Sequence, residues 1–276
     1  MKMKTKLSHL HTGVTIEYSL TGPAQADTLL FVHGLGPNLH QFEPQERYFS
    51  QHFQVLLVSL RGHGGSSVPD HPTEKDFTVG QLAGDVKALL AELDIRQAHF
   101  IGNSLGGLIG YRLLETEAKL LSSLTTFGTT AELHTSSAMV WFLTSLTRTL
   151  GPSILGKLAG VSTKDKAVAR QISAMFAAAN KNAIWMTQKN ISDYDYTPVL
   201  QDRNLPMLLV RSQQDAEINA QLDSTLDVLQ QNPNFQLREL EGVGHFVNME
   251  NPQAFNWVLS DFLTEVTENM RMEEVS

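Results

Sequence analysis

Two kinds of segment alternate along this chain: short apolar runs and longer amphipathic stretches. This alternation predicts a mostly parallel sheet covered by helices. The apolar runs that we expect to form strands are Val14–Leu20, Thr28–His33, Gln54–Ser59, Ala98–Gly102, Leu121–Phe127, Met207–Arg211 and Phe235–Glu239. The fold class expected from this order is α/β.

Two helices are predicted most clearly, because their apolar residues recur at three- and four-residue steps. The first carries its apolar residues from Val79 to Leu93. The second begins near Pro252, a residue type that suits the first turn of a helix, and carries its apolar residues from Phe255 to Leu263.

One segment interrupts the alternation of strands and helices. From about Thr130 to Val199 the pattern predicts helices with no strand between them. Open α/β sheets bind ligands at the carboxyl edge of the sheet, so an inserted helical block is expected to cap that edge. The alternative is that these helices only thicken the core. We therefore expect a core of residues 1–129 and 200–276 and a helical cap, or lid, of residues 130–199.

Composition excludes several classes of protein. The net charge of −8 and the lack of a long basic run argue against nucleic acid as a partner. The absence of cysteine excludes disulfides, thiolate catalysis and cysteine-based zinc sites. No signal-like apolar segment follows the N-terminal lysines, and no apolar run approaches the ~20 residues that span a bilayer. A cytoplasmic location without a membrane span is expected.

The motif Gly102-Asn103-Ser104-Leu105-Gly106 predicts a nucleophilic serine. A predicted strand precedes it and a helix-compatible stretch follows it, which is the context that G-x-S-x-G requires for catalysis. The small residues at Gly102 and Gly106 would allow a sharp turn that lifts the Ser104 hydroxyl clear of the sheet. Without this context, the motif would be a chance glycine-rich turn.

A serine hydroxyl needs a base, and His245 is the predicted one. It lies in a glycine-containing loop between the last predicted strand and the last helix, and it is the only histidine in the C-terminal third. His33 is expected to have a structural role. His63, in Arg61-Gly62-His63-Gly64, is expected to brace loops, with catalysis as the alternative.

The oxyanion hole is predicted at two backbone N–H groups. That of Leu105 lies at a helix N-terminus, and that of Leu35 follows a core strand between two glycines. No cluster of residues with metal-ligand spacing appears, so we expect neither a metal nor an organic cofactor.

Four segments together resemble the α/β-hydrolase superfamily: His33–Gly36, Arg61–Gly64, Gly102–Gly107 and Gly244–Phe246. The resemblance runs from about Val14 to Val266 and implies an α/β-hydrolase fold with a Ser-His-Asp triad. The chain order of that family, serine then acid then histidine, directs attention to the loop after Met207–Arg211. There Asp215 is the predicted acid and Glu217 is its rival.

Within the superfamily, the chain is similar to small bacterial carboxylesterases and lactonases and to hydrolases that cleave ring-fission products at a C–C bond. Asn103 is shared with the last group, but Phe246 stands where those enzymes carry tryptophan, and the candidate carboxylate-binding Arg148 and Arg170 lie in no motif. Gly34, Asn103 and Phe246 are the predicted substrate-binding residues. Dehalogenases and epoxide hydrolases of this fold attack with aspartate, so their chemistry does not transfer to Ser104.

The resemblance and the residues predict hydrolysis of a carboxylic ester or lactone through an acyl-enzyme. Because the segment 130–199 is rich in Leu, Met, Phe and Ala, the substrate is expected to be small and largely apolar. One alternative is C–C bond hydrolysis of ring-fission products, and another is a non-catalytic ligand receptor. The oligomeric state is left open.

Overall fold

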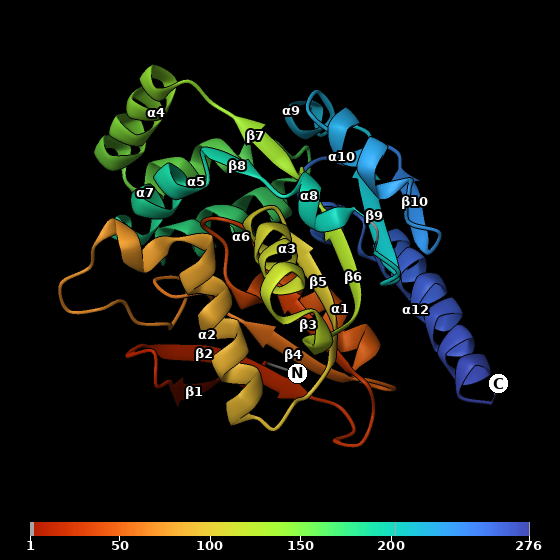
Figure 1. Cartoon of the computed structure of the whole chain (residues 1–276). Coiled ribbons are helices and arrows are strands. Elements are labelled where there is room, and N and C mark those ends of the chain that lie inside the picture. The colour runs from red at the N-terminus through yellow and green to blue at the C-terminus, as the bar shows by residue number, and fades with distance from the viewer. Residues whose placement is uncertain (1–2, 202, 276) are drawn as a thin grey trace.

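An eight-stranded sheet flanked by helices forms the centre of the computed structural model, which describes residues 3–201 and 203–275 (Figure 1). The strand order across the sheet is β1-β2-β4-β3-β5-β6-β9-β10. The pairings β1–β2 and β2–β4 are antiparallel and the others are parallel. The strands are β1 (Lys6–His9), β2 (Thr15–Thr21), β3 (Thr28–Val32), β4 (Gln54–Val58), β5 (Ala98–Asn103), β6 (Leu121–Phe127), β9 (Met207–Ser212) and β10 (Phe235–Leu240).

Helices cover both faces of the sheet and fill the connection between β6 and β9 (Figure 1). Those in the first half of the chain are η1 (Leu39–Phe42), α1 (Glu43–Phe49), η2 (Glu74–Phe77), α2 (Val79–Glu92), α3 (Leu105–Glu117) and η3 (Ala118–Leu120). Those between β6 and β9 are α4 (Ser137–Leu150), α5 (Pro152–Gly160), α6 (Lys166–Ala177), α7 (Lys181–Asn190) and α8 (Thr197–Leu200). The last group is α9 (Ala216–Asn219), α10 (Asp223–Leu229), α11 (Val247–Glu250) and α12 (Pro252–Val275).

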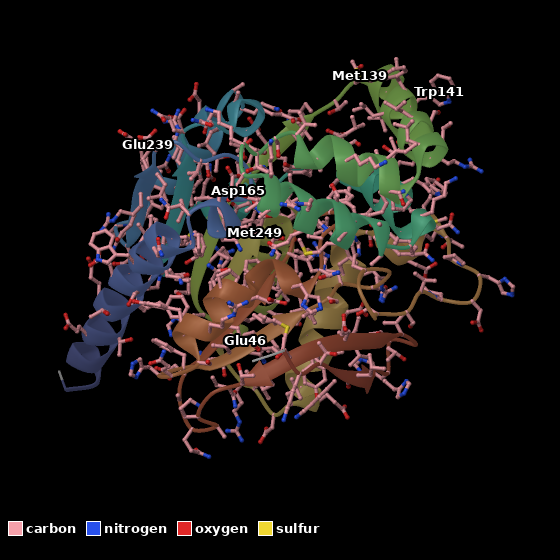
Figure 2. The ribbon with its side chains drawn as sticks, turned by 180° about the vertical axis from the view of Figure 1, so that it is seen from behind. Glu46, Met139, Trp141, Asp165, Glu239 and Met249 are labelled. Carbon is pink, nitrogen blue, oxygen red and sulfur yellow. The ribbon has the colours of Figure 1, made fainter. Side chains whose placement is uncertain are left out.

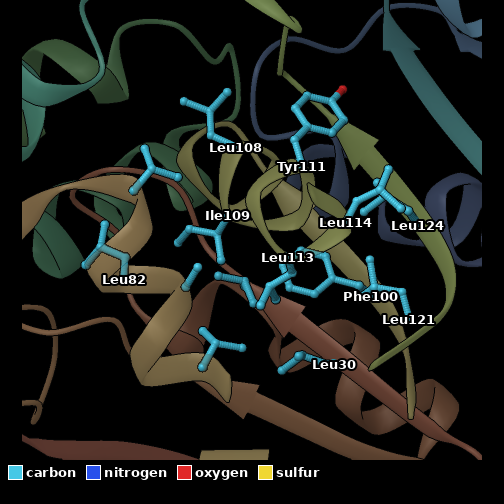
Figure 3. Packing of buried hydrophobic residues seen from close by; sticks show 14 of the residues in the cluster. Leu30, Leu82, Phe100, Leu108, Ile109, Tyr111, Leu113, Leu114, Leu121 and Leu124 are labelled. Carbon is cyan, nitrogen blue, oxygen red and sulfur yellow. The ribbon is translucent and has the colours of Figure 1, made fainter. Parts of the chain in front are cut away.

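The core consists of two apolar layers on opposite faces of the sheet. Side chains alternate between the faces along each strand, so Leu30 and Val32 of β3 join the layer under α2 and α3. Leu29 and Phe31 of the same strand join the layer under α1 and α12. Figure 3 shows the first layer, in which Leu82 of α2 and side chains of α3 pack over the sheet. Because both faces are covered, β3 and β4 are nearly continuous apolar runs.

The helices between β6 and β9 contact loops at the carboxyl ends of the parallel strands. Phe176 of α6 packs on Gly36 after β3, and Ala183 of α7 packs on Gly62 after β4. The backbone N–H of Asn180 also donates to Gly62 O at 2.7 Å. These contacts place α6 and α7 over the edge of the sheet where the loops after β3 and β4 converge.

The expectation of helices without strands in this segment is wrong in one detail. Its two ends pair as an antiparallel ribbon of β7 (Glu132–His134) and β8 (Asp193–Asp195), which lies at the base of the inserted helices (Figure 1). Each of these strands is short and largely polar, so neither has the apolar alternation from which a strand is predicted.

All seven strands that the apolar runs predict are present, as are both of the helices predicted by periodicity. The pattern does not predict β1, an edge strand whose single apolar side chain, Leu7, is exposed. Across residues 3–201 and 203–275, none of the helices combines the length and apolar character needed to cross a bilayer.

Candidate active site

Ser104 lies at a strained turn between β5 and α3. Its φ of 51° and ψ of −115° are unusual for a residue with a side chain, and within the described residues only Asp94 among the other non-glycine residues has a positive φ. Such conformations cost about 1–3 kcal/mol and persist only where surrounding contacts impose them. Here the Ser104 N–H donates to Phe127 O at 3.0 Å, and its carbonyl accepts from Gly107 N at 2.8 Å. The side chain stays half-buried while its neighbours are buried.

This turn requires glycine at positions 102 and 106, because a Cβ on either residue would clash with nearby backbone atoms. A methyl group on Gly106 would lie 2.1 Å from Val32 O, and one on Gly102 would lie 2.5 Å from the Gly106 carbonyl. Real Cβ atoms do not approach other heavy atoms so closely. The glycines of the motif are therefore required for α3 to pack against the ends of β3 and β5.

His245 and Asp215 form a hydrogen-bonded pair from two different loops. His245 Nδ1 lies 2.7 Å from Asp215 Oδ2, and Asp215 is buried while His245 is 25% exposed. A carboxylate at Nδ1 selects the tautomer that leaves Nε2 free to accept a proton. Glu217, the rival acid, is exposed on α9. Of the two candidate acids, Asp215 is thus the one in contact with His245.

The His245 ring and Ser104 both border the end of β6. A methyl group on Gly128 would lie 2.8 Å from His245 Cε1, and Gly128 directly follows Phe127, whose carbonyl accepts the Ser104 N–H. The Asn103 amide also bridges the two segments, with Nδ2 at 3.2 Å from Phe127 O and 3.5 Å from His245 O. The nucleophile candidate and the base candidate therefore share one wall of the site.

The peptide that carries the Leu35 N–H is held by His33. The His33 Nε2 accepts from Leu60 N at 2.9 Å, so Nδ1 carries the hydrogen and donates to Gly34 O at 2.6 Å. The carbonyl of Gly34 and the N–H of Leu35 belong to one peptide plane and point in opposite directions. Gly34 itself lies against Ser104, because a methyl group on it would be 3.2 Å from Ser104 Cβ. His33 thus fixes the direction of the Leu35 N–H beside the serine.

His63 holds the next peptide in the same way. Its Nε2 accepts from Gly36 N at 3.2 Å and its Nδ1 donates to Arg61 O at 3.0 Å. Arg61 in turn forms a buried pair with Asp85, with Nε 2.5 Å from Oδ2. Burial lowers the pKa of His63 to about 4 and the pKa of His33 well below its ordinary value. With these lowered pKa values both rings are neutral near pH 7, and their hydrogen bonds to backbone groups hold the loops after β3 and β4 together.

This burial gives an expected pH dependence of stability. Above the ordinary histidine pKa of about 6.5, His63 is neutral in the folded and unfolded chain; below it, the unfolded chain takes up a proton first. The free energy of unfolding should therefore fall as the pH drops from about 6.5 towards 4, where the folded state also becomes protonated. Between about pH 7.5 and pH 5, His63 alone should contribute a loss of about 2 kcal/mol.

The measurement is urea unfolding at both pH values for the wild type and for His63→Gln. The variant is expected to lose less stability on acidification than the wild type, because glutamine does not titrate. Carboxylates and the other histidines contribute equally to both proteins, so an identical loss in the two would contradict a neutral buried His63.

The predicted substrate-binding residues Gly34, Asn103 and Phe246 are all buried. The Asn103 side chain is engaged by protein groups, since its Oδ1 also accepts from Gln41 Nε2 at 2.9 Å. Phe246 packs with Val168, Ile172, Met175, Phe176 and Met249 beneath α6. Their role in substrate binding stays a prediction, and the contacts of Asn103 favour a structural role for that residue.

A buried amide network, which sequence reasoning did not find, connects the turn at Ser104 with the segment after His245. Gln41 donates to both Asn103 and Asn248, and Asn248 Nδ2 donates back to Gln41 O at 2.9 Å. Gln45 extends the network to Asn256 of α12 at 2.9 Å. No local sequence pattern predicts such a network, because Gln41 and Asn248 lie 207 positions apart in the chain.

Glu250 was also missed, and it holds the backbone on both sides of His245. Its Oε2 accepts from Gly244 N at 3.1 Å and its Oε1 accepts from Phe246 N at 3.2 Å. The helix α11 brings the carboxylate back onto the loop, since Glu250 N donates to Phe246 O at 2.9 Å. Two charge-assisted hydrogen bonds thus fix the peptides that flank the candidate base.

Glu250→Ala should lower kcat about 10- to 100-fold and change KM little, because a misplaced imidazole affects proton transfer more than binding. The kcat of Glu250→Gln should lie between those of the wild type and Glu250→Ala. The glutamine amide has a single oxygen, which can accept from only one of the two N–H groups that the carboxylate binds. Steady-state kinetics with thermal melting checks both variants. Glu241→Gln, an exposed acid in the same loop, is the control. A loss confined to melting temperature would contradict the positioning role.

No three His, Asp or Glu side chains converge as a possible metal site in the part of the chain that the structure describes. The groups gathered at this edge of the sheet are instead a serine, a histidine–carboxylate pair and candidate N–H donors.

Leu105 is the first residue of α3, so its N–H has no acceptor within the helix.

Comparison with known proteins identifies the family. The family model described as alpha/beta hydrolase fold matches residues 27–252, which is most of the chain. The chain belongs to the α/β-hydrolase family. It is a hydrolase, as are the enol-lactonases that it resembles. The matched region includes Ser104, Asp215 and His245 and all of the inserted helices.

Some of the relatives and solved structures match most of the chain. The 3-oxoadipate enol-lactonase 2 of Acinetobacter baylyi is 28% identical over 260 residues, 88% of this chain and 91% of the relative. The crystal structure of the enol-lactonase from Burkholderia xenovorans has a TM-score of 0.81 at 27% identity and covers 94% of this chain and 100% of its own. A hydrolase from Pseudomonas aeruginosa has a TM-score of 0.82 at 25% identity, covering 94% and 98%.

Proposed function

We propose that the chain hydrolyses a carboxylic ester or a lactone through an acyl-enzyme on Ser104. The observation that carries the proposal is the 2.7 Å bond between His245 Nδ1 and Asp215 Oδ2 beside the strained turn at Ser104. A non-catalytic receptor has no need for a serine at a strained turn next to an oriented imidazole. The near full-length similarity to enol-lactonases supports an ester-like bond as the target.

In the proposed mechanism, the Ser104 oxygen attacks the carbonyl carbon while His245 Nε2 accepts the hydroxyl proton. Asp215 keeps the imidazole in the required tautomer and stabilises its charged form. The N–H groups of Leu35 and Leu105 bind the oxyanion of the tetrahedral intermediate. His245 then gives the proton to the leaving alcohol oxygen, which stays within the same molecule when the substrate is a lactone. Water activated by His245 releases the acid and restores Ser104.

The substrate is proposed to be small and largely apolar. Next to Phe246, helix α6 presents Met175 and Phe176 among other apolar side chains. Phe176 also packs against Gly36, next to the candidate oxyanion donor Leu35. An acyl or alcohol group that enters between α6 and the Ser104 turn would therefore meet apolar surface. In this proposal the helices between β6 and β9 act as the cap of the site.

The test is a series of p-nitrophenyl esters from acetate to octanoate, together with aliphatic five- and six-membered lactones. Turnover of esters or lactones is the expected result, and the preferred chain length would measure the acyl site. If the wild type turned over neither class but hydrolysed dienoate ring-fission products, the C–C bond alternative would replace the proposal. No turnover of any of them would leave a receptor as the better description.

A further inference from the structure

Helices α4 and α5 present an apolar surface that no other part of the described chain covers. On α4 the exposed apolar residues are Met139, Trp141, Phe142 and Leu146, and Trp141 is 72% exposed. None of the α4 residues, all of which the structure describes, is buried. Figure 2 shows Met139 and Trp141 at the edge of the molecule, where α4 projects away from the sheet. An amphipathic helix normally buries its apolar face, so this face lacks its usual cover.

Helix α5, which follows α4 in the chain, carries an exposed apolar stripe whose residues are about one helical turn apart. Ile154, Leu158 and Val161 recur at the helical period and are all exposed, and Val161 at the end of the helix is 81% exposed. Lys157 is exposed within the same stripe. We call the exposed apolar residues of α4 and this stripe the α4–α5 face. Its extent exceeds the single exposed apolar residues that are normal on a protein surface.

The sequence segment that carries the α4–α5 face has a net positive charge, opposite in sign to that of the chain. Between Leu133 and Lys164 the sequence contains no aspartate or glutamate. It carries the exposed Lys157 and Lys164, and Arg148, whose guanidinium lies over Trp185 of α7. The whole chain has a net charge of −8. Acids flank this segment on either side: Glu132 lies 3.8 Å from His134, and Asp165 accepts from Ala167 N as the N-cap of α6.

We propose that the α4–α5 face docks on an anionic lipid surface. Exposed tryptophan and phenylalanine beside aliphatic residues suit the boundary between headgroups and acyl chains, and cationic side chains suit anionic headgroups. A second copy of the chain fits less well, because lysine is depleted at the centre of protein interfaces whereas Lys157 lies inside the apolar stripe. At a lipid surface, the stem of Lys157 lies along the apolar layer and its ammonium reaches the headgroups.

In this orientation the lipid would contact helices α4 and α5. The exposed edge of the sheet at β1 would not contact it. Arg148 already lies over the Trp185 ring of α7 at 5.2 Å, so α4 is held to the neighbouring helix while its outer face stays free. The inference concerns binding alone and holds whatever reaction Ser104 carries out. It is compatible with the absence of a membrane-spanning helix among the described residues, since an interfacial helix lies on the bilayer and does not cross it.

The experiment is co-sedimentation of the full chain with vesicles of ether-linked phosphatidylcholine, with or without about 30% ether-linked phosphatidylglycerol. Ether-linked lipids are used because an esterase cannot degrade them. Binding is expected to be about tenfold stronger with the anionic lipid and to weaken with added salt. The double variant Trp141→Ala/Phe142→Ala should reduce the partition coefficient at least about tenfold. Trp257→Ala is the matched control, because Trp257 is 65% exposed on α12, away from the α4–α5 face.

A blue shift of tryptophan fluorescence on vesicle addition should be retained in Trp257→Ala and largely lost in Trp141→Ala. Lys157→Gln should weaken binding to the anionic vesicles only. Absence of vesicle binding by the wild type, or equal binding by the double variant, would overturn the proposal. So would a dimer in sedimentation velocity that the double variant converts to a monomer, because a second copy would then cover the face.

Discussion

Replacing Ser104 with alanine should abolish turnover while leaving the chain folded. We expect kcat to fall by at least about 10⁴-fold, since the acyl-enzyme cannot form without the hydroxyl and the remaining site supplies only binding and oxyanion stabilisation. The structure should survive, because the backbone bonds of residue 104 to Phe127 and Gly107 do not involve its side chain. Thermal melting within a few degrees of the wild type and steady-state kinetics check the two halves of this prediction.

Covalent labelling makes the same prediction independent of the choice of substrate. A fluorophosphonate should modify the wild type once, on the peptide that contains Ser104, and should not modify Ser104→Ala. Ser122→Ala removes a half-buried serine at the opposite end of the sheet, in β6, and should be labelled and active like the wild type. Labelling of Ser104→Ala at an undiminished rate would assign the nucleophile to another residue.

Replacing Asp215 with asparagine should have the second largest effect, a loss of about 10³-fold or more in kcat. The amide of asparagine would donate to His245 Nδ1, which would move the imidazole proton to Nε2. In that tautomer the ring cannot accept the serine proton. The loss should appear in kcat with a small change in KM, because Asp215 is buried behind the ring and away from the substrate.

Glu217→Gln provides the matched control for this assignment. Glu217 lies two residues from Asp215 and carries the same charge, but its side chain is exposed. Its removal should change kcat by less than about twofold, as expected for a surface carboxylate. A dead Glu217→Gln together with a fully active Asp215→Asn would reverse the assignment of the acid.

The sequence by itself determined the sheet and the turn at Ser104. Continuous apolar runs are readable as strands because both faces of the central sheet are covered. The turn can be predicted because Gly102 lies against the Gly106 carbonyl, four residues further on, where a methyl group would not fit. Both features depend on residues that are close in sequence, so their signal is local. The strands β1, β7 and β8 are short edge strands that bury little, and the pattern does not predict them.

Only the tertiary structure shows which of Asp215 and Glu217 contacts His245. Both carboxylates lie in one loop, and their distance to an imidazole 30 positions further along the chain depends on how β9 and β10 are paired. The contacts of Glu250, Gln41 and Asn248 depend on the fold in the same way, since each bonds to a peptide or side chain that packing brings near. The α4–α5 face likewise appears only once the inserted helices are placed. Apolar periodicity shows that a helix has an apolar face, whereas the packing of the whole chain decides whether that face is covered.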